Sequence, residues 1–136
     1  AAKDYELAKG ICQAVADFAR ELIVLALSGG QLARAAADMG LRTALEFFAD
    51  RAYEEDGTLV ARGKPGAMIT DEDEAIGRVV RMVKEQTVTA ITGKEIPIRA
   101  DSVCVHGDGE KALAFVEKIR EVFRREGIEV CSLDRR

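Results

Sequence analysis

The sequence contains few of the residues on which metal, redox and nucleic-acid sites depend. Its 136 residues include one histidine, three cysteines and no tryptophan. Cys12, Cys104 and Cys131 form no CxxC pair and are odd in number, so we expect them in the core rather than at a metal or redox site. The 20 basic residues are mixed among 24 acidic ones, with a net charge of −4, which does not indicate a surface for nucleic acid.

Long apolar runs and phosphate-binding motifs are also missing. No apolar stretch approaches the roughly 18 residues that a membrane span needs, and the first residues lack the pattern of a signal peptide. The chain contains no GxxxxGK[ST] phosphate loop. With 48% hydrophobic residues it can fill a core. We therefore expect a cytoplasmic protein of one domain whose partners include neither nucleic acid nor a membrane.

The pattern of apolar residues predicts helices that alternate with strands. Helical spacing covers residues 4–20, 31–39, 75–85 and 110–126. Extended apolar segments predict strands at 22–27, 41–49, 101–106 and 128–133, and a hairpin that joins 88–91 to 95–98. The first strand is apolar throughout, which favours burial on both faces, and Thr70 is the predicted N-cap of the third helix.

This order predicts an α/β fold with a parallel sheet, because consecutive parallel strands need a crossover, usually a helix. An open doubly wound sheet and a closed barrel both fit, and composition does not separate them. The chain begins at Ala1 without a methionine, close to the start of the first predicted helix. The four strands outside the hairpin are also few for either architecture. We therefore expect a fragment of a longer protein.

Polar side chains follow two of the predicted strands at the point where each strand ends. Asp50, Arg51 and Tyr53 follow the second strand, and His106 and Asp108 lie at the end of the strand that begins at residue 101. The carboxyl ends of parallel strands meet at one edge of the sheet, where catalytic sites of α/β proteins are usually built. The sequence therefore predicts one shared site.

His106 is the candidate for general acid or base catalysis, because histidine titrates in the range that suits proton transfer. The alternative is a buried histidine that is hydrogen-bonded for structure. Asp108 would orient His106, bind a metal or act as a base, and the alternative is an N-cap for the following helix. A nucleophilic Cys104 is disfavoured, because it falls within an apolar run and no separate base or oxyanion device is evident.

The residues after the second strand have both functional and structural readings. Asp50 would serve as a base or metal ligand and Arg51 as a clamp for a carboxylate, whereas an internal ion pair is the structural alternative. Tyr53 would donate a hydrogen bond to a substrate, or it would pack at the rim of the site.

Two further segments are candidate binding elements. The stretch 50–70 has no helical period, and loops of this length in compact domains are usually functional. Its Arg62 and Lys64 fit an anionic substrate, although exposed basic residues are commonly just solvated. Ser28-Gly29-Gly30, between a strand and a helix, resembles a phosphate-binding turn, for which close packing is the alternative.

Three segments in this order and spacing resemble the LamB/YcsF family: Phe48-Ala-Asp-Arg-Ala-Tyr53, Leu59-Val-Ala-Arg-Gly-Lys-Pro-Gly-Ala-Met-Ile69 and Val103-Cys-Val-His-Gly-Asp108. The resemblance runs from about Ala2 to Val130. Family members are longer and carry upstream motifs rich in histidine and aspartate that have no counterpart here. The chain is therefore similar to their C-terminal half.

The resemblance implies a parallel (β/α) barrel of the glycoside hydrolase/deacetylase type. It implies the activity of the A subunit of the prokaryotic ATP-dependent 5-oxoprolinase, which converts 5-oxoproline to glutamate together with B and C subunits. ATP is the implied cofactor, and a divalent metal stays open. The alternatives are a metal-dependent, deacetylase-like hydrolase and a non-catalytic binding or regulatory subunit. A half barrel exposes strand edges, so we expect association with the missing half or with a second copy.

Overall fold

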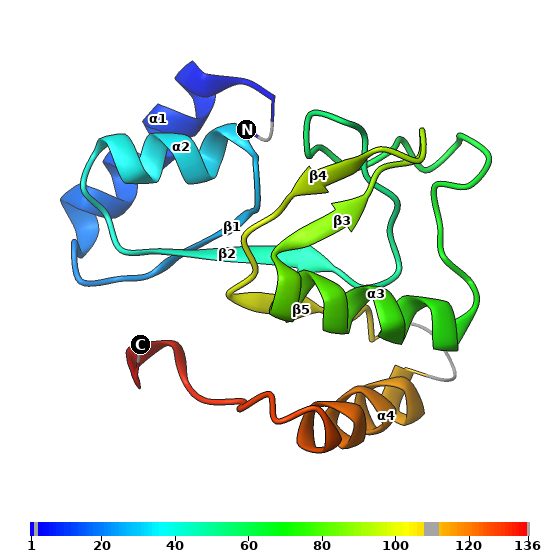
Figure 1. The fold of residues 1–136 in the computed structure, drawn as a ribbon. Helices are drawn as coiled ribbons and strands as arrows, with labels where there is room; N and C mark the ends of the chain where they lie inside the picture. The colour runs from blue at the N-terminus through cyan, green and yellow to red at the C-terminus, as the bar shows by residue number, and fades with distance from the viewer. Residues whose placement is uncertain (2, 108–111, 136) are drawn as a thin grey trace.

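The computed structural model describes residues 1, 3–107 and 112–135 (Figure 1). The described helices are α1 (Tyr5–Phe18), α2 (Gln31–Asp38), α3 (Glu72–Glu85), α4 (Ala112–Arg125) and the short 3-10 helix η1 (Leu133–Arg135). The strands are β1 (Val24–Leu27), β2 (Thr43–Phe48), β3 (Thr87–Thr89), β4 (Glu95–Pro97) and β5 (Ser102–Cys104). None of the helices in these ranges is long and apolar enough to cross a membrane.

The central feature is a parallel sheet in the order β1-β2-β5, which confirms the predicted α/β class. Leu27 pairs with Glu46, and Glu46 in turn pairs with Ser102, so the three strands end at the same edge of the sheet. The predicted hairpin is also present as a separate antiparallel pair of β3 and β4. Within the described residues the sheet is open, with β1 and β5 at its edges, and a closed barrel is not seen.

Two helices pack together at one end of the sheet. Figure 1 shows α1 and α2 side by side beside β1. Asp4 starts α1 by accepting a hydrogen bond from the backbone N–H of Leu7 at 3.0 Å, a standard N-cap. Small buried side chains, among them Ala8, Cys12 and Ala35, allow the two helices to approach closely.

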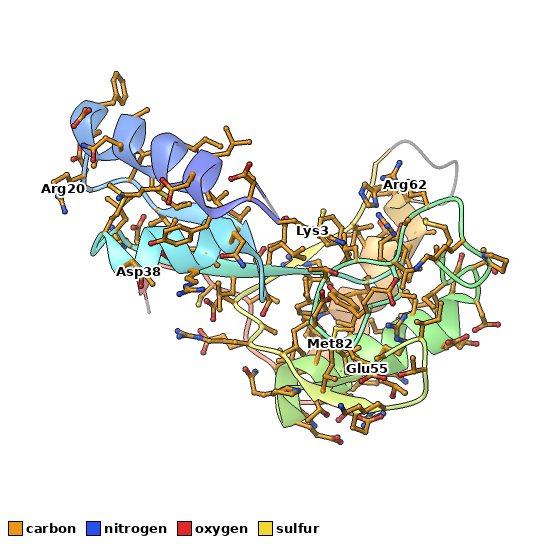
Figure 2. All side chains as sticks on the ribbon, turned by 90° about the horizontal axis from the view of Figure 1, so that it is seen from above. Lys3, Arg20, Asp38, Glu55, Arg62 and Met82 are labelled. Carbon is orange, nitrogen blue, oxygen red and sulfur yellow. The ribbon has the colours of Figure 1, made fainter. Side chains whose placement is uncertain are left out.

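The larger core lies where α3, α4 and the hairpin meet β2 and β5. Phe47 from β2, Tyr53 from the loop and Met82 from α3 are fully buried there. Figure 2 shows Met82 directed from α3 into the interior. Burying a side chain of this size contributes about 1.5–3 kcal/mol to the free energy of unfolding, so this core holds the carboxyl end of β2 in place.

The prediction of a last strand at 128–133 is wrong. Ile128 packs against the core, but Val130 is 54% exposed and only Leu133–Arg135 form a regular element, the helix η1. A cavity of about 580 Å³ lies between this segment and β5. The backbone of this segment does not pair with that of β5. Cys131 is exposed, so the prediction of core cysteines holds for Cys12 and fails for Cys131.

Two smaller predictions also need correction. The first strand is not covered on both faces, because Leu25 is 46% exposed while the helices cover its other side. The N-cap of α3 is Asp71 rather than Thr70, and its carboxylate accepts from the backbone N–H of Glu74 at 2.8 Å. Aspartate is a strong N-cap and carries a charge that suits the helix dipole, so it displaces the neighbouring threonine.

Candidate functional site

The ends of β2 and β5 bring Asp50 and His106 together, although 56 positions separate them in the sequence. Phe48 pairs with Cys104 across the two strands, so the residues two positions further on lie beside each other at the sheet edge. His106 Nδ1 lies 3.1 Å from Asp50 Oδ2, and the two side chains are 32% and 25% exposed. The prediction that these two strand ends meet is confirmed.

The surroundings hold the imidazole ring in one orientation. The ring of Phe48 stacks on His106, with centroids 5.6 Å apart and an angle of 22° between the planes. When Nδ1–H of a neutral imidazole donates to Asp50, the lone pair is placed on Nε2. The other carboxylate oxygen, Asp50 Oδ1, is buried without a hydrogen-bond partner in the described structure. The pair is thus arranged to take up or release a proton at Nε2.

Tyr53 supports this pair from inside the core. Its side chain is fully buried, and its hydroxyl oxygen accepts a hydrogen bond from the backbone N–H of Phe48 at 2.9 Å. Burial raises the pKa of Tyr53 to about 12. The structure therefore connects Tyr53 to the site through the backbone of Phe48, and its hydroxyl does not reach the surface as a substrate contact would require.

Arg51 is also buried, with 6% of its surface exposed. Its Nη2 donates to the backbone oxygen of Val60 at 2.6 Å, and no carboxylate pairs with it in the described residues. The structure thus shows neither an ion pair with Asp50 nor an exposed clamp. Arg78 of α3 donates from Nη2 to the backbone oxygen of Arg51 at 3.2 Å. The sequence analysis identified no candidate site residue in that helix and so missed Arg78.

Glu46 and Cys104 lie on the same face of the sheet as Phe48. They precede Asp50 and His106, respectively, along the two strands. The pKa of the Cys104 thiol is raised by burial first and then by Glu46, with which it hydrogen-bonds, and by Asp50. A raised pKa keeps the thiol protonated and argues against a nucleophilic role. The sequence analysis missed Glu46. The available signal was that Glu46 is a charged residue inside an otherwise apolar strand.

The two basic loop residues lie on the surface. Lys64 Nζ is 2.9 Å from Glu54 Oε1, so its charge is paired within the loop. Arg62 is exposed and has no hydrogen bond or ion pair in the part of the chain that is described (Figure 2). Their predicted contact with an anionic substrate stays a prediction.

The turn Ser28-Gly29-Gly30 lies at the same sheet edge, at the end of β1. Ser28 is buried, and Gly29 has a φ of +80° and packs against the backbone of Gly57. A cavity of about 170 Å³ beside the turn is lined by Glu55 and Asp56. Hydrogen bonds from Lys94 and Thr58, respectively, lower the pKa of these two carboxyl groups, so both are anionic at neutral pH. Two carboxylates fit a phosphate poorly, and the positive φ of Gly29 explains the glycine at that position.

Metal binding has limited support in the described residues. No three histidine, cysteine, aspartate or glutamate side chains within 1, 3–107 and 112–135 are grouped to hold a metal ion. Asp108, a predicted catalytic residue, lies outside the described residues.

The fold and the site together define an α/β protein with a carboxylate–imidazole pair at the carboxyl edge of a parallel sheet. The chain belongs to the LamB/YcsF family, whose model matches residues 1–136. It is 59% identical over 133 residues to a Clostridium beijerinckii protein named as the A subunit of 5-oxoprolinase, covering 98% of this chain and 52% of that protein. A protein of the same name from Staphylococcus aureus is 52% identical, with 97% and 53% covered.

A solved structure shows the same fold. The lactam utilization protein from Thermus thermophilus superposes with a TM-score of 0.85 at 39% identity, covering 95% of this chain and 51% of that one. The chain therefore spans about half the length of the relatives it matches.

Proposed function

We propose that this chain is part of the A subunit of an ATP-dependent 5-oxoprolinase, which hydrolyses 5-oxoproline to glutamate. The names of the relatives supply the substrate class. The observation that carries the proposal is the contact between Asp50 and His106 at the sheet edge, because it provides a proton acceptor that lactam hydrolysis needs.

The chemistry explains why ATP would be consumed. A five-membered lactam is an unreactive amide, so water attack requires activation of the carbonyl or strong stabilisation of the tetrahedral oxyanion. Phosphorylation of the carbonyl oxygen by ATP would provide the activation. Because the chain has no P-loop and the Ser28 turn is flanked by carboxylates, we place ATP outside that turn, with the partner subunits or the rest of the protein.

His106 would act first as a base and then as an acid. Nε2 takes a proton from the attacking water, and Asp50 stabilises the imidazolium that forms. The proton then goes to the ring nitrogen as the carbon–nitrogen bond breaks, which gives the amine and an acyl phosphate at the former lactam carbonyl. A second water hydrolyses the acyl phosphate, which releases glutamate and inorganic phosphate. The stack of Phe48 on the imidazole keeps Nε2 aimed at the same point during both steps.

The proposed enzyme also contains parts that lie outside this chain. We place this chain in the C-terminal half of a (β/α) barrel in the cytoplasm, working with B and C subunits. Leu7, Ile11 and Phe18 of α1 are 54%, 40% and 85% exposed, and Leu25 of the edge strand β1 is also exposed. Apolar surface next to an open sheet edge suits closure by further strands and helices, whether from the other half or from a second copy.

The experiment is to measure glutamate release from 5-oxoproline by the assembled subunits with and without ATP. We expect release only when ATP and all subunits are present. A second candidate is a metal-dependent deacetylase-like hydrolase. It is favoured because Asp50 Oδ1 has no hydrogen-bond partner among the described residues and Asp50 lies beside His106, and both residue types ligate metals. Hydrolysis that persists without ATP and stops with a chelator would select that candidate.

A further inference from the structure

Two arginines near the Asp50–His106 pair have no carboxylate partner among the residues that the structure describes. Arg51 is 6% exposed, and Arg78 is half-buried on α3. In the described structure their guanidinium groups donate only to backbone oxygens, those of Val60 and Arg51. Within the described part of the chain, Arg51 Nε and Arg78 Nη1 are buried and have no acceptor.

This arrangement is unusual for a charged group. A guanidinium stays protonated in proteins, and burying an ion is strongly unfavourable unless it is paired. Burial lowers the pKa of Arg78, and the nearby Glu74, one helical turn away, only partly opposes this effect. Arg81, three residues further along α3, shows the ordinary alternative, because Glu85 and Glu95 lie 3.2 and 2.8 Å from its nitrogens.

The unsatisfied atoms belong to one connected group. Arg51 follows Asp50 directly in the chain, and Arg78 is hydrogen-bonded to the backbone oxygen of Arg51. Both guanidinium charges act on the buried hydroxyl of Tyr53, which places them in the same region. Glu46 also acts on Tyr53 and Glu74 acts on Arg78, but neither carboxylate is hydrogen-bonded to Arg51 or Arg78 in the described residues. Among these residues the two guanidinium groups therefore have N–H donors that no acceptor uses.

We propose that Arg51 and Arg78 form an anion-binding pair that takes one carboxylate or phosphate oxyanion next to the Asp50–His106 pair. A planar guanidinium binds such a group through two parallel N–H donors, and a loop held only for structure would not need buried charges. On the proposed function, on which this identification rests, the anion is the carboxylate of 5-oxoproline. Binding it here fixes the lactam ring relative to Nε2 of His106.

The test is equilibrium binding to the assembled protein by calorimetry, with three probes: 5-oxoproline, the neutral ring 2-pyrrolidinone, and inorganic phosphate. The variants are Arg78→Gln, Arg78→Lys and the control Arg81→Gln on the same helix. We expect Arg78→Gln to weaken 5-oxoproline binding about 10–100-fold, Arg78→Lys to weaken it less, and Arg81→Gln to leave it unchanged. Binding of 2-pyrrolidinone should be the same in all variants, because it lacks the carboxylate.

The outcomes separate the sources of the anion. Loss of phosphate binding in Arg78→Gln, with 5-oxoproline binding unchanged, would assign the pair to a phosphate group. Unchanged binding of both anions in Arg78→Gln, or no binding of either by the native protein, would overturn the inference. In turnover, Arg78→Lys should raise KM more than it lowers kcat, whereas a merely structural role would lower the amount of folded protein instead. Failure of the native assembly to release glutamate would refute the proposed function while leaving the binding result to decide the anion site.

Discussion

Replacing Tyr53 with phenylalanine tests how the core supports the site. The substitution removes the hydroxyl that accepts from the backbone N–H of Phe48 and leaves that N–H unsatisfied in a fully buried position. A buried donor without a partner costs about 1–3 kcal/mol, so we expect the free energy of unfolding to fall by that amount. Denaturant unfolding followed by circular dichroism measures the change.

The second tyrosine of the chain provides the control. Tyr5 donates to Asp38 Oδ2 at 2.7 Å, but this contact is exposed, so Tyr5→Phe should leave the free energy of unfolding essentially unchanged. Because Phe48 also stacks on His106, Tyr53→Phe should lower turnover more than it changes KM. Equal stability of the two variants would refute the reasoning, as would a rise in KM alone, which would point to substrate contact by Tyr53.

Three further predictions concern the site and its pH dependence. Asp50→Asn should reduce kcat/KM by about 10²-fold or more. Adding His106→Ala should reduce kcat/KM little further, because paired catalytic groups act as a unit, and kinetics of the single and double variants measured together test this prediction. Iodoacetamide should label the exposed Cys131 well before Cys104, whose pKa is raised, and peptide mass spectrometry at short times would show the reverse order if that burial is wrong. Since the pKa of Tyr53 is about 12 in the folded state against 10 when unfolded, stability should fall as pH rises through 10 to 12, by about 2–3 kcal/mol, and Tyr53→Phe should not show this part of the loss.

Much of the fold follows from local patterns in the sequence. Amphipathic spacing located α1, α2 and α3, and the apolar runs located β1, β2 and β5, because these signals depend on which residues can be buried. Segment 128–133 has the same kind of apolar pattern and yet forms no strand, since pairing depends on whether the backbone of β5 lies within reach. That distance is a tertiary property that no local pattern contains.

The site was predictable to the same extent. The rule that parallel strands end at one edge of the sheet was sufficient to predict that Asp50 and His106 lie close together. The rules could not show that Tyr53 and Arg51 turn inward, because a polar residue after a strand fits the surface and the core equally well in the sequence. Arg78 was missed because an arginine on an amphipathic helix is usually solvated, and only the packing of α3 against the loop buries it.

The most direct test of the account is the rate of ATP-dependent glutamate release by the assembled enzyme carrying His106→Ala, compared with the native assembly. We expect kcat to fall by about 10²–10⁴-fold, the usual contribution of general acid–base catalysis, with the circular dichroism spectrum unchanged. Turnover at the native rate in a folded His106→Ala enzyme would contradict the assignment of the proton transfer to the Asp50–His106 pair.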